Sequence, residues 1–150
     1  MPSTFLIACV LVGATSAMHA VGIAMLVRIL RRVHALMTTG LWHITRLLIC
    51  LTWYLILLHL AEISVWGLFY LWWGCLPDAE SALYFSSATY TTIGYGDLVL
   101  AKPWRVLAPI EGLTGILMCG LSAGFFFALV NHFVQRAPHA NTGGGSEAER

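Results

Sequence analysis

The chain has 150 residues, of which 59% are hydrophobic and 10% are charged, and its formal net charge is +1. Soluble domains are about 45–50% apolar and about 25% charged, so this composition excludes an ordinary soluble protein and indicates an integral membrane protein. The mean hydropathy of +0.79 agrees with that reading, and the expected surroundings are the lipid bilayer. The near-neutral charge excludes nucleic acid as a partner, because no basic surface is available to neutralise phosphates.

Three apolar runs are long enough to cross a bilayer, which takes about 20 consecutive apolar residues in a helix. They extend from about 5 to 30, from about 44 to 73 and from about 105 to 133. The first run has neither the basic leader nor the cleavage site of a signal peptide, and its apolar stretch is too long for one. We therefore expect a retained transmembrane helix over residues 1–34, in which His19 is the only ionisable residue before Arg28.

Small residues recur along this first helix at spacings of three and four. Such a stripe lets membrane helices approach closely, so it predicts the face by which the first helix docks onto the other spans, of its own chain or of a neighbouring copy. The stripe consists of Gly13, Ala17, Ala20 and Ala24.

Basic residues predict the orientation, because loops rich in Lys and Arg stay on the cytoplasmic side. They surround the connection between the first two spans, which places the N-terminus outside and the C-terminus in the cytoplasm. The outer end of the second span carries aromatic residues that are typical of a membrane–water interface. The basic residues are Arg28, Arg31, Arg32 and Arg46, and the aromatic residues are Trp66, Tyr70, Trp72 and Trp73.

The segment between the second and third spans begins and ends on the outside. Its residues 79–91 suit one short helix, and the motif Thr-Thr-Ile-Gly-Tyr-Gly-Asp follows at residues 91–97. This topology requires a re-entrant helix and loop. Non-helical backbone at membrane depth is tolerated only where protein encloses it or where it lines a water-filled path.

The motif has a direct chemical interpretation. A K⁺ ion that sheds its water needs oxygens in a similar arrangement, and backbone carbonyls that all point to one side supply them. Gly94 and Gly96 permit this, because glycine enters left-handed backbone conformations at little steric cost. Thr92 adds a hydroxyl oxygen at the inner end, and Asp97 places a carboxylate at the outer mouth.

At these residues the chain resembles the potassium-channel family, and within it the small bacterial channels with one pore loop per chain. The resemblance covers about residues 47–134 and implies an all-α membrane protein with three transmembrane helices, a re-entrant pore helix and a selectivity-filter loop. In this family four loops form the carbonyl rings, so the partner implied is three further copies of the chain, in a homotetramer. The residues implied to line the K⁺ sites are Thr92, Ile93, Gly94 and Tyr95, followed by Gly96.

The resemblance divides the chain into residues 1–34, an additional helix; residues 41–136, the pore module; and residues 137–150, a Gly- and Ser-rich tail that we expect to be disordered in the cytoplasm. It also implies a residue at the outer mouth, because the family often has a pore-helix aromatic that hydrogen-bonds the acid after the filter. Tyr84 occupies that position opposite Asp97. Ordinary interfacial packing of Tyr84 is an equal alternative.

Some members of the family have a glutamate behind the filter at a position that Ala88 occupies here. Glu111, in the third span, is the candidate to replace it, because a carboxylate within a membrane span is by default a functional hypothesis. Glu62 and His59 lie one turn apart in the second span, and we hypothesise that all three form a network behind the filter. The alternative is that a hydroxyl or carbonyl satisfies each group separately. A metal site at His59 and Glu62 is not predicted, because no third ligand has suitable spacing.

The third span contains candidate gating residues. By resemblance, Gly115 is the hinge. Gly120 and Gly124 form a GxxxG pair, for which close helix packing is the alternative to a gating role. One of three consecutive phenylalanines, of which Phe125 is the first, is a candidate hydrophobic constriction of the pore.

The function that the resemblance implies is a K⁺-selective channel in the cell membrane, of bacterial inner-membrane type. K⁺ is its permeant ion, and no organic cofactor or enzymatic activity is expected. The alternative is a non-conducting or K⁺-sensing membrane subunit of a larger assembly, since an intact filter motif does not show that the pore ever opens.

Overall fold

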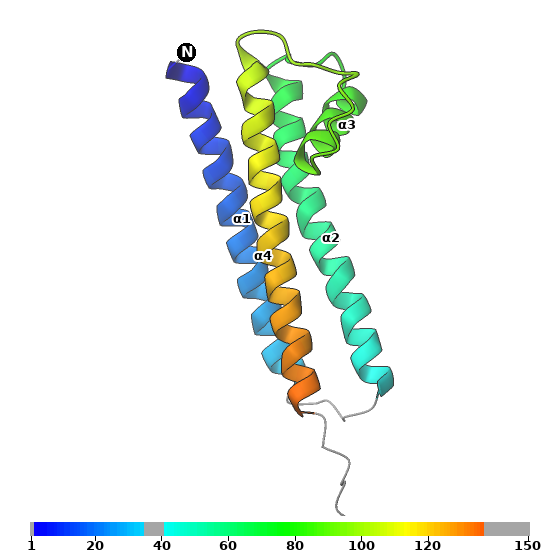
Figure 1. Cartoon of the computed structure of the whole chain (residues 1–150). Helices are drawn as coiled ribbons and strands as arrows, with labels where there is room; N and C mark the ends of the chain where they lie inside the picture. Colours follow the sequence, from blue (N-terminus) through cyan, green and yellow to red (C-terminus); the bar gives the residue numbers. More distant parts are fainter. Residues whose placement is uncertain (1, 35–40, 137–150) are drawn as a thin grey trace, which may run out of the picture.

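The computed structural model describes residues 2–34 and 41–136, and every regular element within these residues is a helix (Figure 1). Three of the described helices are long and apolar enough to cross a membrane, which confirms the predicted class of all-α membrane protein. The predicted tail at residues 137–150 lies outside the described residues. The elements are α1 (Pro2–His34), α2 (Leu41–Trp72), α3 (Ala79–Tyr90), the 3₁₀ helix η1 (Trp104–Val106) and α4 (Leu107–Arg136).

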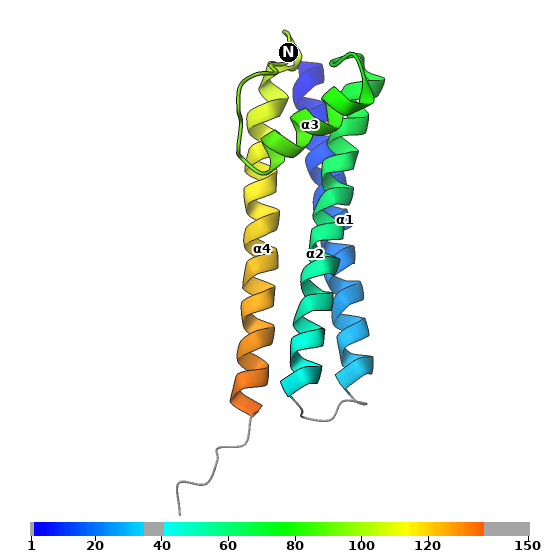
Figure 2. The same cartoon turned by 90° about the vertical axis from the view of Figure 1, so that its right-hand side faces the viewer.

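The three long helices run side by side as a bundle, and the short helix α3 lies across one end of it (Figures 1 and 2). The N-terminal end of α1 is at this same end. The loop that follows α3 returns along the bundle to the start of α4 (Figure 2). The bundle therefore has one end built around α3 and an opposite end formed by long helices alone.

Helix α1 docks through a different face from the one predicted. The small-residue stripe is exposed in the single chain, as Gly13 and Ala17 illustrate, so it is not the face that docks onto this chain's own module; docking onto a neighbouring copy stays a prediction. The buried positions of α1 also recur every three or four residues, but they form another stripe: Thr4, Ala8, Leu11, Thr15, His19, Gly22 and Leu26.

Specific contacts with α2 explain this choice of face. The Tyr54 hydroxyl donates to the Gly22 carbonyl at 2.8 Å. A Cβ atom at Gly22 would lie 2.6 Å from a methyl group of Leu58, so the absence of a side chain permits the close approach of α1 and α2 here. His19 on the same face bonds to α2 as well. Polar contacts and one glycine, rather than the row of alanines, determine the rotation of α1.

The aromatic end of α2 is divided between core and surface. Trp66 and Tyr70 are fully buried, whereas Trp72 and Trp73 are exposed, so only the latter two remain candidates for the interfacial belt predicted from the sequence. Tyr70 packs edge-on against Phe85 of α3, with ring centroids 5.3 Å apart. The expected belt therefore contributes half of its members to the core that holds α3 in place.

The start of α3 is fixed by Asp78. One carboxylate oxygen of Asp78 accepts from the Ser81 backbone N–H at 2.8 Å, and the other accepts from the Ser81 hydroxyl at 2.9 Å. This N-cap satisfies an amide that would otherwise lack a partner at the helix start. The same hydrogen bonds from Ser81 hold the pKa of Asp78 below its usual range. The helix ends at Tyr90, immediately before the motif.

Candidate functional site

The loop that carries the motif has an alternating backbone. Thr92, Gly94 and Gly96 have φ angles of 61°, 54° and 78°, whereas the two residues between them do not enter the positive-φ region. In an extended chain successive carbonyls point in opposite directions. Alternation between left-handed and ordinary backbone conformations is the pattern that can remove that opposition and turn successive carbonyls toward the same side. The two glycines adopt this conformation readily, as the sequence predicted.

Thr92 is the unexpected member of this series. It is β-branched, and a positive φ angle is uncommon for such a residue and is found where the surrounding structure fixes it. Two backbone hydrogen bonds hold this part of the loop against the last turn of α3: the Thr92 N–H donates to the Thr89 carbonyl at 2.9 Å, and the Gly94 N–H donates to the Ala88 carbonyl at 3.0 Å. The unusual backbone is therefore supported from the pore-helix side.

The outer end of the loop contains the expected contact between Tyr84 and Asp97. The Tyr84 hydroxyl donates to one Asp97 carboxylate oxygen at 2.8 Å, and the other oxygen accepts from the Leu98 backbone N–H at 3.0 Å. The bond to Asp97 raises the pKa of Tyr84. The loop is thus attached to α3 at both ends, near Ala88 and at Tyr84.

A hollow of about 330 Å³ lies between the loop, α3 and the start of α4. Its lining includes Thr89, Gly94 and Gly112, and Arg105 is its charged member. Glu111 does not line it, although it precedes Gly112 in the chain. The structure therefore does not place Glu111 directly behind the loop, where the sequence analysis expected it.

Glu111 instead lies in a cluster of hydroxyl groups behind α3. It is fully buried, and it accepts hydrogen bonds from the Tyr70 hydroxyl at 2.7 Å and from the Ser86 hydroxyl at 2.5 Å. The Ser86 oxygen also lies 2.8 Å from the Ile63 carbonyl. This group, the Glu111 cluster, connects α4, α2 and the middle of α3.

Glu62 is the centre of a second cluster, one turn further along α3. His19 of α1 and His59 of α2 both approach its carboxylate, with Nδ1–oxygen distances of 2.8 Å and 3.4 Å. The Tyr90 hydroxyl donates to the second carboxylate oxygen. His59 also contacts the Ser122 hydroxyl of α4, at 3.1 Å from Nε2. This Glu62 cluster brings together residues of all four α-helices.

The predicted three-residue network is therefore divided between two clusters. His59 and Glu62 lie together, and Glu111 lies in the other cluster with different partners. The two carboxylates hold α3 at Ser86 and Tyr90, which are four residues apart and so occupy one face of the helix. Both acids position the helix that precedes the loop rather than the loop itself.

Gly115 has a packing role in this arrangement. A Cβ atom there would lie 2.0 Å from the Tyr90 carbonyl oxygen, which is closer than any real contact. Since Gly115 lies within the continuous helix α4, its absent side chain allows the C-terminal end of α3 to rest directly on that helix. The predicted hinge position is thus the point of closest approach between α3 and α4, and its role in gating stays a prediction.

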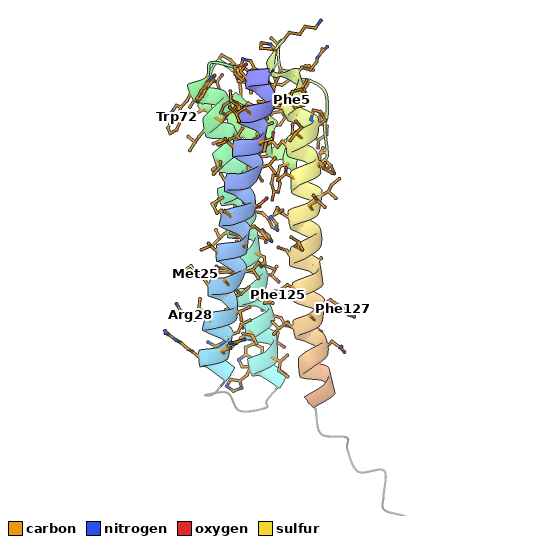
Figure 3. All side chains as sticks on the ribbon, turned by 90° about the vertical axis from the view of Figure 1, so that its left-hand side faces the viewer. Phe5, Met25, Arg28, Trp72, Phe125 and Phe127 are labelled. Atoms are coloured by element: carbon orange, nitrogen blue, oxygen red, sulfur yellow. The ribbon has the colours of Figure 1, made fainter. Side chains whose placement is uncertain are left out.

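The other candidate gating residues lie nearer the opposite end of α4. An added Cβ atom would meet nothing within 4 Å at Gly120 or at Gly124, so neither glycine is required for packing within the chain. Phe125 is half-buried beside the cluster formed around Leu26, whereas Phe127 is 72% exposed and its side chain lies on the far side of α4 (Figure 3). Of these two phenylalanines, Phe127 is the one that the chain leaves uncovered.

A protein-family model described as "Ion channel" matches residues 56–132, just over half of the chain, and includes about half of α2, all of α3, the loop and most of α4. This chain is a member of the pore-domain ion channel family with two transmembrane helices per module. That family includes potassium channels. Helix α1 lies outside the match. Neither the curated proteins nor the solved structures include a significant match to this channel.

The sequence analysis missed several residues that the channel's two clusters contain. His19 had a usable signal, because an ionisable group within a membrane span is rare and marks a specific environment. The hydroxyl partners had none, since serine and tyrosine occur in membrane helices for many reasons. They are Tyr70, Ser86, Tyr90 and Ser122.

Proposed function

We propose that this ion channel is a K⁺-selective homotetramer whose filter is the loop Thr92–Gly96. The observation that carries this proposal is the alternating backbone, with positive φ angles at Thr92, Gly94 and Gly96. It turns consecutive carbonyls to one side, and rings of such carbonyls replace the hydration shell of K⁺ in potassium channels. The Thr92 hydroxyl adds one more oxygen at the inner end.

The orientation of α3 supports a cation as the permeant species. Its C-terminal residue, Tyr90, directly precedes the filter, so the negative end of the helix dipole lies at the inner end of the ion path. At the other end, Asp78, Glu80 and Asp97 are carboxylates near the mouth. Four copies of this arrangement would concentrate cations on both sides of the filter.

The exposure of the filter loop supports the tetramer. All residues from Thr91 to Asp97 are exposed in the single chain, including Ile93 at 56% and Tyr95 at 71%. Non-helical backbone cannot face lipid, because its polar groups would lose their hydrogen-bond partners. Neighbouring subunits on one side and the water-filled ion path on the other would provide the missing surroundings.

The distribution of basic residues supports an N-terminus and filter mouth on the outside of the cell membrane. Arg28 lies in the half of α1 distant from α3, toward the end opposite the filter mouth (Figure 3). Arg46, near the start of α2, is at that same end. By the positive-inside rule this end is cytoplasmic, which is the expected arrangement for a bacterial inner membrane.

Ion flux through the purified protein in liposomes tests this function. With a K⁺ gradient we expect K⁺ flux that greatly exceeds Na⁺ flux. Gly94→Ala and Gly96→Ala should each abolish selective K⁺ flux, because an alanine side chain disfavours the left-handed backbone at these positions. Open space surrounds both glycines, so the loss would arise from backbone conformation rather than from a clash.

Gly74→Ala is the matched control. Gly74 has a φ angle of 62°, and its Cβ position is equally open, but it lies in the connection before α3. Its substitution imposes similar backbone strain outside the ion path and should leave selectivity unchanged. Equal K⁺ and Na⁺ flux would refute selectivity, and no K⁺ flux at any voltage or pH would favour a non-conducting subunit instead.

A further inference from the structure

The Glu62 cluster contains three side chains of the kind that bind transition metals. His19 of α1 and His59 and Glu62 of α2 each offer one ligand atom, and these atoms all lie within 4.8 Å of one another. His19 and Glu62 are buried, and His59 is mostly so. The third ligand that the sequence analysis lacked comes from a helix about 40 residues away in the chain.

The distances between these atoms are close to those of a coordination shell. Zinc binds imidazole nitrogen at about 2.0–2.1 Å and carboxylate oxygen at about 2.0–2.2 Å, so tetrahedral ligands lie roughly 3.3 Å apart. His59 Nδ1 is 3.4 Å from one carboxylate oxygen of Glu62, and His19 Nδ1 is 2.8 Å from the other. Binding a metal ion would lengthen the His19 contact and bring all three ligand atoms, which lie within 4.8 Å of one another, to this separation.

The hydrogen bonds around the two imidazoles also suit a metal. Histidine ligands usually donate their second ring N–H to another group, which fixes the ring. His59 Nε2 has such a partner in the Ser122 hydroxyl. Its Nδ1 lies 3.1 Å from the Tyr90 hydroxyl and 3.4 Å from Glu62, so an ion bound at Nδ1 would take the place of the Tyr90 contact. His19 Nε2 is buried and has no hydrogen-bond partner among the described atoms. The hydrogen bond to Glu62 is therefore the polar contact of His19 that a bound ion would replace.

We propose that His19, His59 and Glu62 bind a divalent transition-metal ion of the Zn²⁺ type. Two imidazoles and one carboxylate form a typical zinc ligand set, with water completing the tetrahedron. The nitrogen ligands exclude K⁺, Mg²⁺ and Ca²⁺ as the intended ion, because those ions select oxygen ligands. This site is separate from the filter.

A groove between α1 and α4 provides a route to the site. It has a volume of about 520 Å³ and reaches His19 between Ser16 and Ala20 of α1 and Met118 and Leu121 of α4. A bound ion would cross-link α1 to α2. Through Tyr90, which bonds to Glu62, it would also fix the end of α3.

Metal binding is tested directly on the full-length protein in detergent, without any measurement of conduction. After treatment with a chelator, the protein is titrated with Zn²⁺ and analysed for bound metal, and Co²⁺ is used as a spectroscopic probe. We expect one Zn²⁺ per chain and a tetrahedral Co²⁺ absorption spectrum. His19→Gln and His59→Gln should each lower the affinity at least about tenfold.

His43→Gln is the matched control, because His43 is an exposed histidine on α2, away from the cluster. The Zn²⁺ affinity of His43→Gln should equal that of the wild type. Ser122→Ala removes only the hydroxyl that contacts His59 Nε2 and keeps all three proposed ligands. It therefore tests the site even if the histidine variants fail to fold. We expect it to weaken Zn²⁺ binding about tenfold. Absence of stoichiometric binding to the wild type, or unchanged affinity in Ser122→Ala and His19→Gln, would overturn the proposal.

Discussion

The two buried carboxylates of this channel have opposite kinds of surroundings. Glu111 and Glu62 are both fully buried, and both hold α3 from behind. Glu111 accepts hydrogen bonds from the hydroxyls of Tyr70 and Ser86, which lie within the family's pore module. Glu62 is approached by two imidazoles, one of which belongs to α1. The first cluster connects helices within the pore module, and the second connects the module to the additional helix α1.

This difference shows how two buried carboxylates that hold the same helix can serve different purposes. A buried carboxylate is costly unless hydrogen bonds and charge partners compensate for its lost hydration. Hydroxyl donors achieve this for Glu111. Imidazole nitrogens can bind metal ions, so the surroundings of Glu62 can respond to a bound metal. We expect Glu111 to contribute mainly to the stability of the fold, and we expect the conformation around Glu62 to respond to metal binding.

The largest effect is expected where α3 meets α4 beside the Glu62 cluster. Gly115→Ala would place a Cβ atom 2.0 Å from the Tyr90 carbonyl oxygen and force the two helices apart. We expect a loss of about 3 kcal/mol or more in stability, together with loss of K⁺ flux. Thermal unfolding of the purified protein measures the first effect. Gly120→Ala is the control, because its Cβ atom would meet nothing within 4 Å; equal stability of the two variants would contradict the packing role of Gly115.

Removal of the Glu111 side chain tests the contribution of the Glu111 cluster to stability. In Glu111→Ala the hydroxyls of Tyr70 and Ser86 lose their acceptor in a buried site, and each unsatisfied group costs about 1–3 kcal/mol. We expect a stability loss of about 3 kcal/mol that is insensitive to added Zn²⁺ or chelator. Glu80→Ala, at an exposed acid on α3, should change stability by less than about 0.5 kcal/mol. If the stability loss of Glu111→Ala changed with added Zn²⁺ or chelator, the two clusters would not be functionally distinct.

His19→Gln tests the other cluster. It removes the contact of α1 with the Glu62 carboxylate, and a hydrogen bond to a charged group contributes about 1.5–3 kcal/mol. We expect hydrogen exchange to increase in α1 and the adjoining part of α2, while the region around Glu111 keeps its protection. His43→Gln should leave exchange unchanged throughout. Uniform loss of protection in both clusters would show that they act as one unit.

The smallest effect is expected at the outer mouth, where Tyr84→Phe removes the hydroxyl that donates to Asp97. This contact is exposed, so we expect a modest increase in the rate at which K⁺ flux declines during sustained conduction. The pKa of Tyr84 is raised above its ordinary value of 10.0, chiefly by the bond to Asp97. The contribution of this bond is therefore fully present below about pH 10 and is lost as the pH rises through the raised pKa.

The control for this pH dependence is the variant itself. Tyr84→Phe cannot ionise at this position, so any alkaline loss of flux seen in the wild type and caused by Tyr84 should disappear. Flux measured in liposomes between pH 8 and pH 11 provides the comparison. Identical alkaline profiles for the two proteins would exclude a contribution from Tyr84.

The helices themselves were predictable from the sequence, because the length of an apolar run determines whether a helix can cross a membrane. The expected run from about 44 to 73 corresponds to α2 at Leu41–Trp72, and the short helix expected at residues 79–91 corresponds to Ala79–Tyr90. The Asp78 cap and the polar motif determine where α3 begins and ends. Local chemistry was sufficient for these features.

The sequence did not allow us to predict which face of each helix packs against its neighbours. A row of small residues indicates that a face can pack closely, but the contacts of His19 and Gly22 decided which face of α1 does so. Likewise, Glu111 was recognised as unusual, whereas its partner Ser86 was not. These outcomes depend on residues far apart in the chain, and no single-helix periodicity contains that information.

The exposed loop Thr91–Asp97 links the channel's function to its biogenesis. A single chain newly inserted into the bilayer would carry an exposed non-helical stretch that its own helices do not cover. With the proposed tetramer, subunit association completes the burial of this stretch, so folding and assembly are parts of one equilibrium that depends on protein concentration in the membrane. The loop that would recognise the ion would thus also be the part of each subunit that only its partners can cover.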